Sequence, residues 1–294
     1  MLYIYLDTSF LSQLTKTARG TPEASFNTGK WINLLNLLRQ GVKRGIFLCP
    51  ASQFQTEEAM LAEGLLQEFV SLQLELCKGC YFKKYQDILV HQVANQVLIY
   101  LKRPQDIDLG WKAFTRVPPP VRDPLTTART KSNMVQYAEL VKPLREKFGR
   151  RVSYKGHYKA EKVAFLEQTF LNPNSYLPVK LITEAKVQEG EVPKLFSFFN
   201  PESVDRVPFI NIFCSLWASI IFHERTRRSK YGDLLDIVAL ACAIPYCQIV
   251  TTDTNMKTII RRLHFNEKYG VSVYAPTDKD VDALAEMLSG LNST

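Results

Sequence analysis

The sequence predicts an α/β fold in which helices cover both faces of a short parallel sheet, interrupted by a large helical insertion. Short β-rich runs alternate with helical segments near both ends of the chain, and such alternation is typical of parallel sheets buried between helices. The middle of the chain lacks this alternation and is broken by stretches such as RVPPPVRDP. We therefore expect a discontinuous α/β domain, residues 1–75 and 208–294, and a mainly helical, basic insertion, residues 76–207.

The first half of the α/β domain begins with LYIYL at residues 2–6, a β-rich run that leads directly into a helical pattern. An amphipathic helix is expected over residues 27–43, followed by the short strand IFLC at residues 46–49. Ser52 is a suitable N-cap for the next helix. Its apolar stripe continues as far as Phe69, which predicts one helix after Ser52.

The second half of the α/β domain is expected to contain two helices, a strand, a helix, a strand and a final helix. The longest nearly apolar segment, FINIFCSLWASIIF, has fourteen residues, which is short of the roughly 20 that cross a bilayer. It therefore predicts a buried helix. The six expected elements are residues 209–223, 233–244, 248–252, 254–262, 271–276 and 278–288.

Composition and cysteine usage point to a cytoplasmic protein without membrane contact. The N-terminus MLYIYLD lacks the basic region and cleavage site of a secretory signal. Four of the six cysteines lie inside apolar runs, where thiols behave as small hydrophobic groups in a reducing compartment. The CKGC pair at residues 77–80 has no second pair at zinc-finger spacing, which argues against a structural zinc site.

Acidic residues follow or adjoin the predicted strands. In an open parallel sheet, functional groups gather beyond the carboxyl ends of the strands. Two of the acids end strands, and the others lie on helices that follow or precede strands. The acids expected at this edge are Asp7, Glu57 or its neighbour Glu58, Asp233, Asp236 and Asp253.

Carboxylates crowded in this way repel one another, so raised pKa values or bound cations must partly neutralise them. Oxygen ligands without His or Cys suit Mg²⁺ or Mn²⁺, which keep several water ligands. Such a site can activate water for hydrolysis of a phosphodiester bond. Asp233 has a second interpretation, because an Asp at this place can also be a helix N-cap.

Three segments resemble the PIN-domain nucleases: IYLDTSFLSQL, PASQFQTEEA and DLLDIVALACAIPYCQIVTTD. The resemblance as a whole covers about 150 of the 294 residues, in two pieces. The resemblance implies a Rossmann-like three-layer α/β/α fold and divalent-metal-dependent endonuclease activity, usually on RNA. Transferred by motif, it implies the catalytic residues Asp7, Glu57, Asp236 and Asp253, and the same four with Asp233 as ligands of Mg²⁺ or Mn²⁺. Glu58 remains the alternative to Glu57.

The excess of positive charge lies in one segment. Residues 112–162 contain thirteen basic and four acidic residues, whereas the formal net charge of the whole chain is +8. Such clustering favours a polyanionic partner, here RNA over DNA, although a solvated helical face explains the charge equally well. The insertion is also a candidate surface for a protein partner or inhibitor. The cations expected to bind nucleic acid are Arg150, Arg151, Lys155, Lys159, Arg225, Arg227, Arg228 and Lys230.

Two alternatives stay open. A PIN-like chain can keep its acids for structural reasons and serve as a catalytically silent scaffold for RNA or a protein. Arg151 and His157 also have the R-x5-H spacing of the metal-independent HEPN ribonucleases, a short pattern that arises readily in a basic stretch. Metal binding separates the nuclease from both alternatives.

Overall fold

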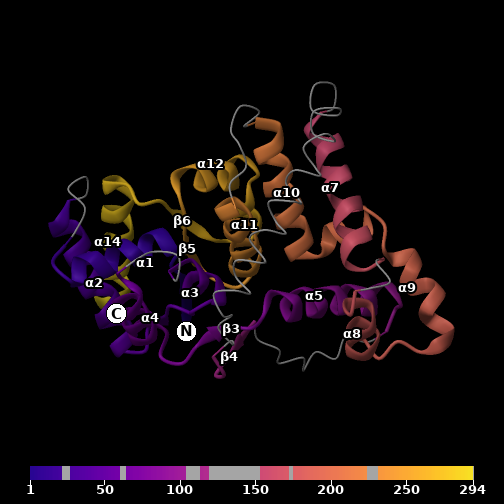
Figure 1. Cartoon of the computed structure of the whole chain (residues 1–294), viewed down its shortest axis with the longest axis horizontal. Coiled ribbons are helices and arrows are strands. Elements are labelled where there is room, and N and C mark those ends of the chain that lie inside the picture. Colours follow the sequence, from indigo (N-terminus) through magenta and orange to yellow (C-terminus); the bar gives the residue numbers. More distant parts are fainter. Residues whose placement is uncertain are drawn as a thin grey trace. The chain divides into compact units, whose positions relative to one another are not determined.

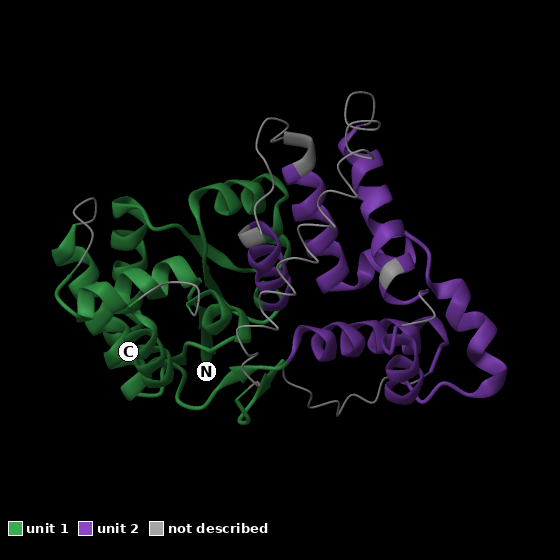
Figure 2. Cartoon of the chain, in the orientation of Figure 1, with its two compact units in different colours: residues 1–83, 113–128, 243–294 green, residues 84–112, 129–242 purple. Residues whose placement is uncertain are grey.

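A computed structural model describes most of the chain, which forms two compact units (Figure 2). Unit 1 comprises residues 1–83, 113–128 and 243–294, and unit 2 comprises residues 84–112 and 129–242. The described residues are 1–21, 27–59, 64–103, 113–118, 153–171, 175–223 and 231–293.

Unit 1 contains a four-stranded parallel sheet, of which β5 and β6 are labelled in Figure 1. Its strands lie in the order β2 (Phe47–Leu48), β1 (Leu2–Tyr5), β5 (Ile249–Thr251) and β6 (Ser272–Tyr274). From β1 the chain passes to β2 on one side and later returns to β5 on the other side. The strand order therefore reverses between β1 and β5, and this is the position at which α/β sheets commonly bind ligands. The expected short parallel sheet is confirmed.

The helices of unit 1 pack around an apolar core. Phe10 and Trp31 meet with ring centroids 5.1 Å apart, and Leu34, Phe47 and Leu284 are fully buried in the same cluster. Asn27 caps the predicted 27–43 helix by accepting hydrogen bonds from two backbone amides of its first turn. The helices are α1 (Thr8–Ala18), α2 (Thr28–Lys43), α3 (Gln53–Ala59), α4 (Leu66–Cys77), α12 (Thr254–Arg262), α13 (Phe265–Lys268) and α14 (Asp278–Ser293).

The single helix expected after Ser52 is wrong. Helix α3 ends at Ala59 and α4 begins at Leu66. Gly64 has a φ of +85°, a backbone conformation that glycine adopts easily and an α-helix cannot contain. The apolar spacing continued across the break because both helices bury residues in the same core.

The middle segment, which the sequence predicts to be mainly helical, also contains two short strands that the sequence analysis did not identify. Strands β3 (Tyr81–Phe82) and β4 (Phe114–Thr115) form a small antiparallel sheet that belongs to unit 1. The Phe114 ring lies against the rings of Tyr3 and Phe82, with centroid separations of 4.2 and 4.9 Å. Strands of two residues are too short to produce a recognisable alternation of apolar and polar residues.

Unit 2 is helical in its described part, and it extends beyond the expected insertion. Helix α10 packs against α5, α7 and η2, because it is apolar over most of its surface and buries Phe209, Ile212 and Leu216. Residues 208–242 therefore group with the helices of unit 2, whereas the sequence assigned them to the sheet domain. The elements are α5 (Tyr85–Tyr100), α7 (Tyr154–Thr169), α8 (Leu177–Glu184), η1 (Glu189–Glu191), α9 (Val192–Phe198), η2 (Ser203–Arg206), α10 (Pro208–His223) and α11 (Tyr231–Ala243).

Two sequence-based expectations concern membrane spans and thiols. Over the described ranges, the helices are all too short or too polar to span a bilayer. The six cysteines are reduced and buried, as expected for thiols that pack as small hydrophobic groups.

Candidate functional site

Asp7 lies at the carboxyl end of β1 and is 8% exposed. It is also the N-cap of α1: its Oδ2 accepts hydrogen bonds from Ser9 N at 3.3 Å and Ser9 Oγ at 2.6 Å. Its own backbone N–H donates to Thr251 Oγ1 at 2.8 Å. The carboxylate is therefore fixed by the first turn of its own helix, and the backbone of Asp7 is fixed by the neighbouring strand.

Asp253 occupies the equivalent place after β5. Its Oδ1 accepts a 2.8 Å hydrogen bond from Met256 N, which makes it the N-cap of α12. Burial is the main cause that raises the pKa of Asp7, hydrogen bonds from Ser9 oppose it, and repulsion from the Asp253 carboxylate raises it further. Two acids expected at one sheet edge thus interact across adjacent strands.

Helix α3 contributes a third carboxyl group, that of Glu58, which is hydrogen-bonded to the residue that follows Asp7. Thr8 Oγ1 donates a hydrogen bond to Glu58 Oε2. Burial raises the pKa of Glu58 to about 7, the hydrogen bond from Thr8 opposes this, and repulsion from Asp7 and Glu57 adds to it. Glu57, the residue that the resemblance nominated, is 3% exposed. The structure therefore places Glu58 beside Asp7, and the assignment of Glu57 to the site stays a prediction.

Asp233 and Asp236 lie on α11 in unit 2. Asp233 is buried in the first turn of this helix, two residues after its start at Tyr231. The N-cap interpretation of Asp233 is therefore wrong. The acidic cluster that unit 1 assembles by itself consists of Asp7, Glu58 and Asp253.

The cluster has the donor chemistry that hard divalent cations prefer, since its ligand atoms are all carboxylate oxygens. Across the part of the chain that the structure describes, no three His, Cys, Asp or Glu side chains are arranged to hold a metal ion. A Mg²⁺ ion commonly keeps several waters and uses one or two carboxylates. The acids of unit 1 fit such a sparsely ligated ion, which would also relieve their mutual repulsion.

Sequence reasoning missed two glutamines beside this cluster. Gln55 Nε2 donates a hydrogen bond to the carbonyl oxygen of Leu6, the residue before Asp7. Gln73 Nε2 donates to Gln55 Oε1 at 2.8 Å. Both side chains are buried. Gln55 stands three residues after the predicted N-cap Ser52, and this capping-box spacing was the signal in the sequence.

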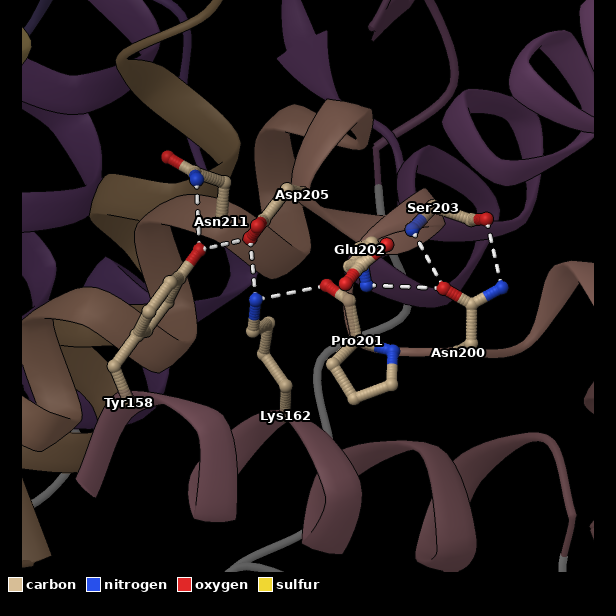
Figure 3. A network of polar contacts seen from close by, with 8 residues as sticks. All are labelled: Tyr158, Lys162, Asn200, Pro201, Glu202, Ser203, Asp205 and Asn211. Carbon is tan, nitrogen blue, oxygen red and sulfur yellow. Dashed lines mark hydrogen bonds and ion pairs between the residues drawn. The ribbon is translucent and has the colours of Figure 1, made fainter. Parts of the chain in front are cut away.

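Of the expected nucleic-acid-binding cations, the structure describes Lys155 and Lys159. They lie one turn apart on α7 and are exposed. A third cation of the same helix, Lys162, is buried: its Nζ lies 2.7 Å from Asp205 Oδ1 and 2.8 Å from the carbonyl oxygen of Pro201 (Figure 3). The remaining expected cations, Arg150, Arg151, Arg225, Arg227, Arg228 and Lys230, lie outside the described residues.

The network around Lys162 fixes the orientation of α7. Tyr158 Oη donates to Asp205 and accepts a 2.8 Å hydrogen bond from Asn211 Nδ2, and the Lys162 ammonium lies 4.2 Å from the Tyr158 ring centroid (Figure 3). Because this side of α7 is bound to η2 and α10, the side that carries Lys155 and Lys159 faces solvent. His157 of the R-x5-H pattern is buried.

Comparisons with known proteins add no family assignment. Protein-family models, curated protein sequences and solved structures were each searched with this chain, and none of the three searches found a match.

Proposed function

We propose that the chain is a PIN-like, divalent-metal-dependent endoribonuclease that hydrolyses phosphodiester bonds in RNA. One observation carries the proposal: Asp7 and Asp253 follow adjacent parallel strands at the reversal of strand order and interact electrostatically. A buried acid such as Asp7 next to a second carboxylate is typical of a functional site, because two carboxylates held close together repel each other unless a proton or a cation neutralises them. A three-layer, Rossmann-like arrangement of helices around the sheet belongs to this proposal.

The chain's own residues would divide the work as follows. Asp7, together with one of its two neighbours Glu58 and Asp253, would hold Mg²⁺ or Mn²⁺ through carboxylate oxygens, and water molecules would complete the coordination. When bound, the ion would lower the pKa of a water molecule and stabilise negative charge on the scissile phosphate. Ser9 fixes the Asp7 carboxylate through its hydroxyl and amide, and Thr8 fixes the Glu58 carboxyl group.

The resemblance also nominates Asp233 and Asp236 as metal ligands, with Asp236 as a catalytic residue. Both stay proposals, and Asp236→Asn tests the second of them. The matched change is Glu286→Gln, which neutralises an exposed acid on α14. Loss of cleavage in Asp236→Asn alone would support the assignment, and equal activity in the two variants would remove Asp236 from the site.

RNA is the proposed substrate because of the charge distribution. The basic excess lies within residues 112–162, and Lys155 and Lys159 are exposed on a helix whose other side is fixed. Exposed cations on one helix face suit a phosphate backbone. A solvated surface would show the same exposure, so the substrate requires a direct measurement.

The experiment that tests the function is incubation of the purified chain with end-labelled single-stranded RNA and DNA. Mg²⁺, Mn²⁺ or EDTA is added in parallel reactions. We expect internal cleavage of RNA with either ion and none with EDTA. Cleavage that persists in EDTA would reject the metal mechanism, and absence of cleavage on every substrate would favour the alternative below.

A catalytically silent scaffold is the second candidate, and one observation favours it. Asp7 and Asp253 each accept backbone hydrogen bonds at the start of a helix, so each has a structural role that does not require a metal. Titration calorimetry with Mn²⁺ separates the two candidates. A scaffold has no need of the ion, whereas the nuclease should bind it and lose binding in Asp253→Asn.

A further inference from the structure

Helix α3 is bonded to the chain on both sides of Asp7. Gln55 Nε2 donates to the Leu6 carbonyl oxygen, one residue before Asp7, and Glu58 accepts from Thr8 Oγ1, one residue after it. Gln55 and Glu58 are three residues apart, so they lie on the same face of α3. A single helix face therefore contacts the chain immediately before and after the buried acid.

The peptide unit between Leu6 and Asp7 is held at both of its polar ends. Its carbonyl oxygen accepts from Gln55 Nε2, and its N–H donates to Thr251 Oγ1 at 2.8 Å. Both hydrogen bonds are buried. Two buried bonds on one peptide plane limit its rotation, and the Asp7 side chain extends from the Cα atom next to that plane.

Gln55 is itself fixed by a capping box and by a second glutamine. Its Oε1 accepts from Ser52 N at 2.8 Å, while its own N–H donates to Ser52 Oγ at 3.4 Å. Its Oε1 also accepts from Gln73 Nε2 at 2.8 Å, and Gln73 Oε1 accepts from Thr56 Oγ1 at 3.2 Å. The bonds to Gln73 determine which end of the Gln55 amide points toward Leu6.

We propose that Gln55, oriented by Gln73, is a positioning residue that places Glu58 against Asp7 in the proposed catalytic site. This inference rests on the proposed function. Neither glutamine touches a reacting group. They act through the backbone of Leu6 and through the place of α3, and the buried amide pair determines the separation of two carboxyl groups from different segments.

The test compares Gln55→Met and Gln73→Met with a matched control, Gln13→Met. Gln13 is a buried glutamine on α1, and its Nε2 has no hydrogen-bond partner among the described residues. Removing a partner that orients a ligand commonly costs about 10–100-fold in metal affinity or activity. We expect losses of that size in kcat and in Mn²⁺ affinity for Gln55→Met, with little change in KM, and smaller losses of the same kind for Gln73→Met.

Hydrogen exchange of the Asp7 amide separates a positioning role of Gln55 from a role in overall stability. A role in overall stability would not change the exchange of this amide selectively. We expect Gln55→Met to accelerate it more than tenfold relative to the Val250 amide in the neighbouring strand, while Gln13→Met changes both amides equally. If Asp7 and Val250 accelerate together in Gln55→Met, the glutamine only stabilises the fold and the inference is rejected.

The same design separates failure of the inference from failure of the proposed function. A wild-type chain that cleaves RNA and binds Mn²⁺, with an unaffected Gln55→Met variant, would reject positioning and leave the nuclease intact. A wild-type chain that neither binds Mn²⁺ nor cleaves RNA would reject the nuclease. The exchange of the Asp7 amide would then still decide whether Gln55 fixes this segment.

Discussion

The backbone N–H of Asp7 on the β1 side donates a 2.8 Å hydrogen bond to the hydroxyl of Thr251 on β5, and both groups are buried. This bond lies where the two strands adjoin, at the reversal of strand order. It orders the carboxyl end of β1 without using the Asp7 carboxylate. The strand pair therefore positions the acid through its backbone and leaves the acidic group to the site.

Replacing Thr251 with Val tests this bond. The variant keeps the shape of the side chain but leaves the buried Asp7 N–H without its acceptor, which commonly costs about 1–3 kcal/mol of stability. Thr251→Ser is the control, because it keeps the hydroxyl. Urea unfolding of both variants measures the difference, and equal midpoints would show that the hydroxyl of Thr251 contributes no stability through Asp7.

Asp7→Asn and Asp253→Asn are expected to abolish metal-dependent cleavage while the fold remains intact. Each Asn keeps an oxygen that can accept the helix-capping hydrogen bonds, and Asn is as good an N-cap as Asp. Each change also removes one repelling charge from the pair. Cleavage assays with Mg²⁺, together with thermal unfolding in EDTA, measure both effects, and full activity in the two variants would reject the mechanism.

The stability of the metal-free chain should depend on the ionisation of Glu58. The pKa of Glu58 is raised to about 7 in the folded chain, so the folded state holds this proton at pH values where the unfolded state has lost it. Protonated Glu58 therefore stabilises the folded state fully at pH values below the pKa that this group has in the unfolded chain. The stabilisation is lost as the pH rises through about 7. A rise of the Glu58 pKa from 4.5 to about 7 corresponds to roughly 3–4 kcal/mol.

Glu58→Gln should remove that dependence. In EDTA at pH 8 the variant is expected to be more stable than the wild type, and at pH 4 the two should be nearly equal. Denaturant midpoints across this pH range measure the effect. Mn²⁺ at pH 8 should stabilise the wild type more than Glu58→Gln, because a bound cation relieves the same repulsion. Parallel pH profiles for the two proteins would contradict the assignment.

The sequence predicted the strands of the parallel sheet and the acids that follow them, because those signals are local. Asp7 and Asp253 each stand between an apolar run and a helical pattern, and the structure places both at helix N-caps. Whether Glu57 or Glu58 faces Asp7 depends on the rotation of α3. That rotation is determined by the contacts of Gln55 with Leu6 and Gln73, which join distant segments and leave no periodic signal.

The sequence pattern also did not predict that α10 groups with the helices of unit 2. An apolar segment such as Phe209–Phe222 must be buried, but its composition does not say against which partner. The structure packs it against α7 and α5. Lys162 shows the same limit, because its place in the basic segment does not reveal that it is buried against Asp205.

The last prediction concerns the exposed side of α7. If Lys155 and Lys159 contact phosphates of a single-stranded RNA, each contact contributes about 0.7 to the slope of log affinity against log salt concentration. The double variant Lys155→Ala/Lys159→Ala should therefore flatten the slope by about 1.4.

Lys43→Ala/Lys279→Ala is the matched control, because it removes two exposed cations from unit 1. RNA affinity measured over a salt series decides between phosphate contact and a solvated face. Unequal slopes for the two double variants support contact at α7, and slopes that change equally would show that only the net charge of the chain matters.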